Sequence, residues 1–576
     1  MSSEMMASNQ KSAITPTSQA CLACRGKHLR CDGVKPVCKR CLENRFDCTW
    51  VQSKRGYVGG RRKKPEHPTL STESSMNECS PTPADAYPPT LPIALSPAGS
   101  SHGSSSTEGT ILRPMVTDLN PAGEHLIDAY YKYFHLAHPI LLPRKVYIQD
   151  PNILPDSLKC VMRFIACNHT AVDPSAYEAQ ARLILSANLP ADVTKVQTMV
   201  LLTIVFFARC EREAGTRALT QAIDTAYTIG LQDETFGAGH AAILRESWRR
   251  TWWELYTLTG LISLVSGVNV RLTAPPGRLL PCACEDYNDG RVSESRTLEE
   301  MQDRWFDQGF VWSSFAYRAE AVRLLSMVRD LDPNELFFDS PSLDAAIASV
   351  KNFIMSLPSH RARGLRADGS TDEVMSCAIM VINLASICLH VPRSDLAEVH
   401  NTATICNNDR PPVLAVDREV HTALAMRSAD AISELVIARK SLDTITPCFS
   451  CSLAFTVSSQ IAAYSLEADK QSPLAIRLRE YVQLALTALS TMGQSWQIAA
   501  VVRMQLAQFV KDLMRGQPAN PVGFGMPAIM QDAARQRMQG TLEDEIWLSE
   551  ILSDTPAFNF NDPIVPQPIY MPAYAT

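Results

Sequence analysis

The chain has 576 residues, of which 46% are hydrophobic, and it carries a formal net charge of −6. Such a length exceeds one typical domain and supplies a sizeable core, which excludes a wholly disordered protein. The N-terminus MSSEMMASNQKS lacks the apolar segment of a secretion signal. The uncharged stretch Leu255–Val270 is interrupted by glycine and serine and is shorter than the roughly 20 apolar residues of a membrane span. We therefore expect a soluble intracellular protein with no membrane partner.

Charge is distributed unevenly along the chain. Residues 1–70 hold 14 basic against 5 acidic residues, a net charge of +9, whereas the remaining 506 residues hold 40 basic against 55 acidic residues, a net charge of −15. A basic segment followed by an acidic body is typical of proteins with separate parts for nucleic acid and for protein partners.

Composition divides the chain into six predicted segments. They are a disordered N-terminus (1–20), a cysteine-rich domain (21–48), a basic linker (49–65), a disordered Pro/Ser-rich linker (66–115), a helical domain (116–515) and an acidic tail (516–576). The Pro/Ser-rich linker contains one aromatic residue, Tyr87, so it cannot bury enough apolar surface to offset its chain entropy.

The long body is predicted to be all-helical. Asn120 and Pro121 provide an N-cap and a first-turn proline, and apolar residues then recur at helical spacing. Further helices are predicted over 196–209, 216–229, 247–264, 374–389, 421–439 and 473–492, with irregular charged insertions at 285–303, 359–372 and 392–412. Alternating strand patterns are nearly absent, so the expected fold class is mainly α.

Six of the 17 cysteines form one array with the spacing C-x2-C-x6-C-x6-C-x2-C-x6-C. They are Cys21, Cys24, Cys31, Cys38, Cys41 and Cys48. Cysteines of an intracellular chain stay reduced, so this array indicates metal binding rather than disulfides. Two thiolates three residues apart lie on one face of a helical turn, and the next six residues let a third approach from the same side.

The number of thiols predicts how they share metal. Six thiolates complete two tetrahedral zinc sites only if two of them bridge both ions, because two separate sites would need eight. The repeated spacing assigns the bridges to Cys21 and Cys38, with Cys24 and Cys31 completing one site and the last two cysteines of the array completing the other. The predicted cofactor is two zinc ions.

Basic side chains are interleaved with these cysteines, and we expect them to contact DNA. The candidate DNA-binding residues are Arg25, Lys27, His28, Arg30, Lys35, Lys39, Arg40 and Arg45. Cations on the outside of so small a module favour contacts with phosphates and bases. The alternative is a zinc module that only staples a small fold, which would not require these charges.

The segment CLACRGKHLRCDGVKPVCKRC resembles the fungal zinc binuclear cluster family of the galactose-regulator type, with the pattern CxxCRxRKxKCDxxxPxCxxC. The resemblance implies that the first helix enters the major groove of double-stranded DNA and contacts a CGG-like triplet. Arg25, Lys27 and Arg30 occupy basic positions of the family, and Pro36 occupies the proline of the joining loop. His28 replaces a base-contacting lysine and offers fewer donors, so either triplet preference or affinity differs, or His28 contacts only phosphate or water.

A second basic run follows the cysteine array. It consists of Arg61, Arg62, Lys63 and Lys64. Such a run suits nuclear import and additional phosphate contacts, and the alternative is a solvated charged linker. We expect the protein in the nucleus.

The body also resembles a known domain. Around the segment ESWRRTWWELYTLTGLISLVSG, residues 120–330 resemble the helical regulatory domain of fungal transcription factors, through Arg249, Arg250, Trp252 and Trp253. Trp248, Trp252 and Tyr256 form an aromatic stripe that we predict to be core rather than a ligand site. The resemblance implies a regulatory module without specifying an effector.

The last 39 residues carry six acidic residues and no lysine or arginine. Bulky apolar residues between the acids suit an activation segment that folds on a coactivator, and the alternative is a C-terminal helix docked on the body.

The sequence contains no phosphate-binding lysine loop, H-E-x-x-H or G-x-S-x-G motif, so we do not expect an enzyme. Cys448 and Cys451 lie in an apolar segment without a basic neighbour and are predicted to be core. No heptad pattern follows the cysteine array, which leaves only a weak homodimer open. The resulting hypothesis is a zinc-dependent, sequence-specific DNA-binding transcription regulator that activates a metabolic pathway or gene cluster. The alternative is a regulatory interaction protein whose zinc cluster is a structural staple.

Overall fold

A computed structural model of the chain separates into two compact units, Met1–Glu108 and Gly109–Thr576. It describes residues 21, 23–24, 31, 34–35, 37–44 and 48 of the first unit, and 121–266, 270–304, 309–331, 340–399 and 417–514 of the second. The predicted disordered N-terminus, the basic and Pro/Ser-rich linkers and the acidic tail lie outside these described residues.

The first unit has a core of thiols. Five cysteines of the array are buried, with Ala23 and Cys48 packed against them. The short helix α2 (Lys39–Asn44) contributes Cys41 to this core, while its Leu42 is 69% exposed. Since the described part buries almost no hydrocarbon, apolar burial cannot stabilise it.

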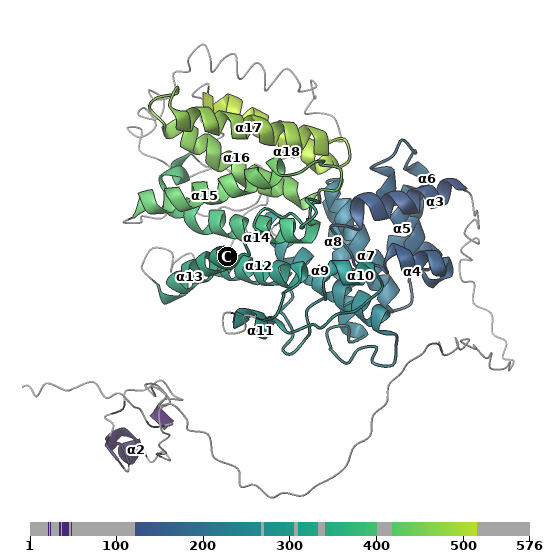
Figure 1. Cartoon of the computed structure of the whole chain (residues 1–576), viewed down its shortest axis with the longest axis horizontal. Coiled ribbons are helices and arrows are strands. Elements are labelled where there is room, and N and C mark those ends of the chain that lie inside the picture. The colour runs from purple at the N-terminus through teal and green to yellow at the C-terminus, as the bar shows by residue number, and fades with distance from the viewer. Residues whose placement is uncertain are drawn as a thin grey trace, which may run out of the picture. The chain divides into compact units, whose positions relative to one another are not determined.

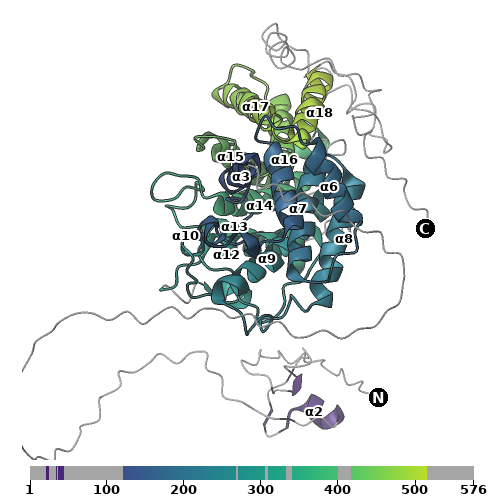
Figure 2. The same cartoon turned by 90° about the vertical axis from the view of Figure 1, so that its right-hand side faces the viewer.

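The first part of the second unit, residues 121–266, is helical. Its first elements are α3 (Pro121–Ala129), η1 (Tyr130–Phe134), α4 (Arg144–Gln149), η2 (Pro151–Ile153), α5 (Asp156–Cys167), α6 (Ser175–Ser186), α7 (Val193–Ala208), α8 (Arg212–Thr228) and α9 (Ala242–Ser266). Helices α7 and α8 pack side by side, as Figure 2 shows.

The remaining helical elements of the second unit lie between residues 284 and 514. They are α10 (Cys284–Asn288), α11 (Leu298–Gln302), α12 (Ser314–Arg329), α13 (Pro341–Ser356), α14 (Glu373–His390), η5 (Val391–Arg393), η6 (Asp395–Glu398), α15 (Arg418–Ile437), α16 (Cys448–Leu466), α17 (Pro473–Met492) and α18 (Gln497–Met514). In Figure 1, α12, α14, α15, α16 and α17 lie in that order, each packed on the next, and α18 packs against both α16 and α17.

These elements confirm the predicted mainly α fold. The described residues contain two isolated bridges, Leu279–Thr297 and Leu365–Thr371, and no longer strand. Helix α17 has the predicted bounds, and the other predicted helices differ from the observed ones by a few residues. The prediction of an irregular insertion at 285–303 was wrong in part, because α10 and α11 lie there. Helix α11 begins with a capping box between Thr297 and Glu300, a signal that was overlooked.

Local signals explain where several helices begin and end. The carboxylates of Asp192 and Asp372 accept hydrogen bonds from backbone N–H groups three residues later, at the starts of α7 and α14. Ser472 caps α17 in the same way, and Pro473 follows in the first turn. Gly230 adopts a φ of +75° just beyond α8, a conformation that glycine allows without a Cβ clash.

Helix α9 packs against the earlier helices α7 and α8 and against the later helix α12. It therefore connects the two groups of helices in the body. A Cβ on Gly260 would lie 2.6 Å from Cγ1 of Val322, so glycine lets α9 approach α12 closely. One contiguous apolar core extends from Leu126 to Val510 through this junction.

The prediction that Leu255–Val270 is the longest uncharged apolar stretch of the chain was wrong, because residues 374–392 form a longer one. The segment Glu373–Arg393 spans 21 residues and is apolar enough to cross a membrane, which Leu255–Val270 is not. Its apolar window is entirely buried inside the body, where α14 packs against α12, α13, α15 and α16. The segment is therefore the central core helix of this unit.

Candidate metal centre

The six cysteines of the array gather into two groups of four. Cys21, Cys24, Cys31 and Cys38 form one group, and Cys21, Cys38, Cys41 and Cys48 form the other. Within each group the sulfur atoms all lie within 4.8 Å of one another. Cys21 and Cys38 belong to both groups. These are the two cysteines that the spacing predicts to bridge the metal ions.

The distances between sulfur atoms test whether zinc fits. Sγ of Cys38 lies 3.7 Å from Sγ of Cys21 and 3.7 Å from Sγ of Cys24, and Sγ of Cys21 lies 3.6 Å from Sγ of Cys41. A zinc ion with bonds of about 2.3 Å to four sulfurs requires a tetrahedron with edges of about 3.8 Å. The thiols therefore already have the spacing of two zinc sites that share an edge.

Each of the two shared sulfurs accepts a hydrogen bond from a backbone N–H group three residues later. The N–H of Cys24 donates to Sγ of Cys21 at 3.4 Å, and the N–H of Cys41 donates to Sγ of Cys38 at 3.4 Å. The hydrogen bond from Cys24 lowers the pKa of the Cys21 thiol to about 6, because it stabilises the thiolate. Burial raises the pKa of Cys24 to about 12. Zinc, when bound, supplies the positive charge that keeps such a thiol ionised.

Three of the eight predicted DNA-contacting residues are described. Lys35, Lys39 and Arg40 are exposed, and the latter two lie in the first turn of α2. The other five, Arg25, Lys27, His28, Arg30 and Arg45, lie outside the described residues, as does the basic run Arg61, Arg62, Lys63 and Lys64.

Comparison with known proteins agrees with this geometry. Residues 19–57 match the fungal Zn(2)-Cys(6) binuclear cluster domain, and residues 160–308 match the fungal specific transcription factor domain. The C6 finger domain transcription factor iacK of Pestalotiopsis fici is 27% identical over 593 residues, covering 92% of this chain and 86% of that protein. Transcription factor lfc1 of Flammulina velutipes is 29% identical over 91 residues, covering 15% of this chain and 31% of that protein. No solved structure matches the chain.

The chain therefore combines a fungal zinc binuclear cluster domain with a fungal specific transcription factor domain, the two domains of a fungal zinc cluster transcription factor. Its binuclear cluster domain binds two zinc ions, and the six thiols have the spacing to hold them. Both matched domains are those of a DNA-binding transcription regulator and not of an enzyme.

In the regulatory body of this transcription factor, Arg250 of the Arg-Arg/Trp-Trp segment is completely buried. Its Nε donates to Oε1 of Glu246 at 2.9 Å, and a terminal nitrogen donates to the carbonyl of Cys282 at 2.8 Å. Its guanidinium also stacks 3.9 Å from the ring centroid of Tyr287 on α10. Arg250 therefore links α10 and the preceding loop to α9. This role is structural.

The aromatic residues of this segment are mainly core. Trp252 and Tyr256 are buried, as predicted, while Trp248 is half-buried against Phe236 and His240. Trp253 is also buried and donates from Nε1 to the carbonyl of Leu279 at 2.8 Å.

A second buried charge cluster was not predicted. Oε1 of Glu254 lies 2.7 Å from Nδ1 of His138, and its other oxygen forms an ion pair with Arg318. Nε2 of His138 lies 3.0 Å from Oγ1 of Thr446. Burial alone would raise the pKa of Glu254, but Arg318 and His138 hold it below its ordinary value. Glu246, Arg250 and Glu254 recur every four residues on α9, a pattern that could have revealed this charged face.

The pair Cys448 and Cys451 lies at the start of α16, half-buried against the apolar core. Burial raises the pKa of Cys448 to about 12, so this thiol stays protonated. The prediction that the pair is core rather than a metal site is consistent with this environment.

Proposed function

We propose that the zinc head, residues 21–48, recognises a short G/C-rich element containing a CGG-like triplet in double-stranded DNA. The observation that carries the proposal is the shared position of Cys21 and Cys38, because two metals at one centre would hold both halves of the head rigidly together. Lys35, Lys39 and Arg40 place cations on the surface of this head, where phosphates would be met.

We assign different tasks to the basic residues of the head. Arg25, Lys27, His28 and Arg30 follow Cys24 in the segment that resembles the family's groove-binding helix, so they are the proposed base-contacting residues. Lys35, Lys39, Arg40 and Arg45 are proposed to contact phosphates, which position the protein without distinguishing sequence.

Selection of binding sites from random DNA tests the proposal, using the full zinc-loaded chain and a His28→Lys variant. We expect enrichment of a CGG-like triplet, and a changed preference or affinity in the variant because lysine adds donors. A Lys39→Ala variant is the control, since loss of one phosphate contact should weaken all sequences alike and reduce the salt dependence by about one unit. Salt-sensitive binding without any enriched sequence would support the staple alternative instead.

We further propose that the protein is a nuclear activator. The basic run Arg61, Arg62, Lys63 and Lys64 would direct import, and neutralising all four should shift a fluorescent fusion from the nucleus to the cytoplasm. An unchanged nuclear signal would show that import depends on another segment.

The acidic tail is the proposed coactivator-binding segment. Replacing Glu543, Asp544 and Glu545 with their amides keeps the size of the side chains but removes three charges, so reporter transcription should fall while DNA binding stays constant. If the amide variant leaves transcription unchanged but truncation after Met514 lowers body stability, the docked-helix alternative is supported.

The proposed targets are the genes of a metabolic pathway or gene cluster, as the family resemblance implies. Transcript sequencing after deletion of the gene tests this proposal. Reduced expression of functionally related genes is expected, whereas increased expression would indicate a repressor.

A further inference from the structure

One surface of the body is basic although the body as a whole is acidic. Residues 351–366, which include the end of α13 and the loop after it, hold one lysine and three arginines and no acidic residue. By contrast, the 506 residues after residue 70 carry a net charge of −15. Lys351 and Arg363 are exposed, and Arg361 is half-buried. This local excess of positive charge on an acidic body favours a negatively charged partner.

Most of these cations are not compensated by carboxylates of the body. Nε of Arg366 lies 2.9 Å from Oε1 of Glu285, so this arginine is paired. Among the residues that the structure describes, no acidic side chain forms an ion pair with Lys351, Arg361 or Arg363. Three positive charges of the segment therefore remain for a partner.

Two exposed apolar side chains lie beside these cations. Val311 is 77% exposed and Met355 is 70% exposed, the largest values among the large apolar residues of the described body. Met355 lies one helical turn after Lys351 on α13. Val311 precedes Trp312, whose carbonyl oxygen accepts a hydrogen bond from Nη1 of Arg361 at 2.9 Å. Apolar groups rimmed by charged residues are typical of interaction surfaces. We define the Met355 surface as Val311, Lys351, Met355, Arg361 and Arg363.

Contacts beneath the Met355 surface hold its parts together. Nη2 of Arg304 donates to Oγ of Ser356 at 2.6 Å, which ties the segment after α11 to the end of α13. The rings of Tyr317 on α12 and Phe353 on α13 meet edge to face, with centroids 6.1 Å apart. Because Phe353 is buried, Met355, two residues later in the helix, faces outward. The surface is therefore built on packed elements.

The acidic tail of the chain has a complementary composition. The last 39 residues carry six acidic residues and no lysine or arginine, and four of the acidic residues lie within residues 543–552. Four bulky apolar residues of this segment have the spacing of one helix face and are Trp547, Leu548, Ile551 and Leu552. The segment therefore offers carboxylates to the cations of the Met355 surface and apolar side chains to Val311 and Met355.

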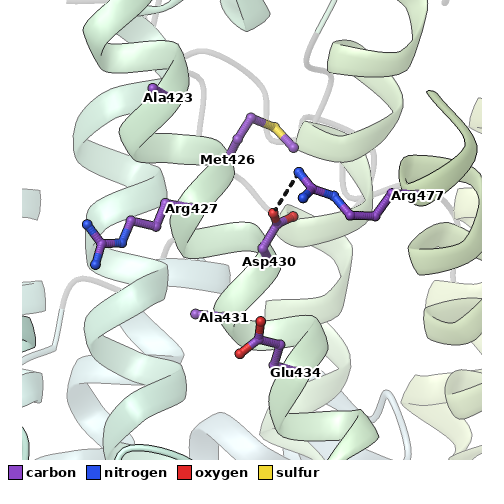
Figure 3. A pocket seen from close by; sticks show the side chains of 7 residues that line it. All are labelled: Ala423, Met426, Arg427, Asp430, Ala431, Glu434 and Arg477. Atoms are coloured by element: carbon purple, nitrogen blue, oxygen red, sulfur yellow. Dashed lines mark ion pairs between the residues drawn. The ribbon is translucent and has the colours of Figure 1, made fainter. Parts of the chain in front are cut away.

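The hollow between α15 and α17 suits the tail less well (Figure 3). Arg477 extends across it from α17 to Asp430, with 3.4 Å between the guanidinium nitrogen and the carboxylate oxygen. Figure 3 also shows Arg427 directed to the other side of α15 from this pair, while Glu434 adds a second carboxylate to the lining. Because its arginine is already paired and two carboxylates line it, the hollow would not attract an acidic segment.

The chain is long enough for its tail to reach the Met355 surface. Helix α18 ends at Met514, and residue 543 follows 29 positions later. Such a connection spans up to about 95 Å when extended, whereas a folded body of about 400 residues has a radius of gyration of only about 21 Å. A flexible tether also gives its end an effective concentration on the order of millimolar, so even a weak contact is populated.

We propose that residues 543–552 of the acidic tail dock on the Met355 surface of their own chain. Docking covers the side chains that the proposed coactivator would bind, so the body holds the tail inactive until a coactivator displaces it. This regulatory part rests on the proposed coactivator role of the tail, whereas the docking contact itself does not. Because ions screen attraction between exposed charges, docking should weaken as the salt concentration rises.

Hydrogen exchange of the full zinc-loaded chain without DNA, followed by mass spectrometry, tests the proposal. The amides of residues 543–552 should be protected in the unaltered chain, and equally so at every protein concentration. The double variant Arg361→Glu, Arg363→Glu should lower this protection by about tenfold, because it turns attraction into repulsion. The matched control Arg217→Glu, Arg245→Glu reverses two exposed arginines on α8 and α9 and should leave the protection unchanged. Circular dichroism verifies folding of each variant.

Two further variants separate the docking contact from effects on folding. Adding Glu543→Lys, Asp544→Lys and Glu545→Lys to the double variant should restore protection to within about threefold of the original, because the charges are exchanged across the contact. Met355→Ser removes an apolar contact without changing charge and should lower protection by about threefold. Leu183→Ser, at an exposed position of α6, is its control and should have no effect.

Rapid exchange of residues 543–552 in the unaltered chain would overturn the proposal, as would protection that is indifferent to the double variant. Protection that increases with protein concentration would place the tail on a second copy and would also overturn it. Reporter transcription is measured in parallel and should rise about threefold in the double variant, because the tail is released. Lost protection without a change in transcription would support docking but contradict the coactivator role, so the two failures are distinguishable.

Discussion

The zinc head and the helical body use the same residue type in opposite ways. In the head, cysteines are brought together and form the core themselves. In the body, Cys377 and Cys388 are dispersed along α14 and buried among apolar neighbours, where each behaves as a small hydrophobic residue. Spacing and surroundings, rather than cysteine content, therefore decide whether a thiol binds metal. The two regions are accordingly expected to depend on different conditions for their stability.

Removal of zinc should have the largest effect and should be confined to the head. Structural zinc contributes about 10–16 kcal/mol in small zinc domains, and the described head has no apolar core to replace it. A strong chelator is expected to abolish DNA binding while the helical signal of the body in circular dichroism remains. Cooperative loss of the body signal on chelation would contradict this separation.

Replacing single cysteines of the head distinguishes a thiol shared by both groups from a thiol that belongs to one group. Cys21→Ala should release both zinc ions, because Cys21 belongs to both thiol groups, whereas Cys24→Ala removes a ligand directly from only one. Native mass spectrometry counts the bound ions. Cys451→Ala in the body is the control and should leave two zincs bound. Equal zinc loss from Cys21→Ala and Cys24→Ala would disprove the bridging assignment.

In the body, breaking a buried ion pair should be costly. Glu254→Gln leaves the Arg318 guanidinium buried without its carboxylate, and the expected loss is about 3–5 kcal/mol of unfolding free energy. Denaturant unfolding measures this loss, and adding Arg318→Met should recover part of it. Arg291→Gln breaks an exposed pair with Asp286 and should change stability by less than about 1 kcal/mol. Similar losses for both single variants would show that the buried cluster has no special role.

Lowering the pH should have a smaller effect on the stability of the body. His135 is buried with both ring nitrogens unpaired, and burial lowers its pKa to about 3 from an ordinary value of 6.5. The unfolded state therefore binds a proton at His135 more readily than the folded state does. The contribution of neutral His135 to the free energy of unfolding is complete above about pH 6.5 and declines as the pH falls toward 3. By pH 5 the loss is about 2 kcal/mol.

The variant His135→Phe tests this assignment, because it removes the titrating group but keeps an aromatic ring beside Tyr131. Thermal unfolding of the body between pH 7.5 and pH 5 should show a weaker pH dependence in the variant. His125→Phe, at an exposed position on α3, should retain the original dependence. An unchanged profile in His135→Phe would assign the acid sensitivity to other groups, such as His169 and His390, whose pKa values burial also lowers.

The sequence by itself determined the features that depend on neighbours along the chain. The cysteine spacing specified which thiols group together, and Ser472, Pro473 and helical periodicity specified α17. These signals are local, because a cap or a ligand pair needs only residues within a turn or two. The capping box of α11 was equally local and could have been found.

Only the tertiary structure decided which distant residues meet. His138 and Glu254 are 116 residues apart, and His138 and Thr446 are 308 apart, so no periodicity in the sequence connects them. Burial of a charge is decided by the packing of whole helices, because the partner that compensates for lost hydration can come from any part of the chain.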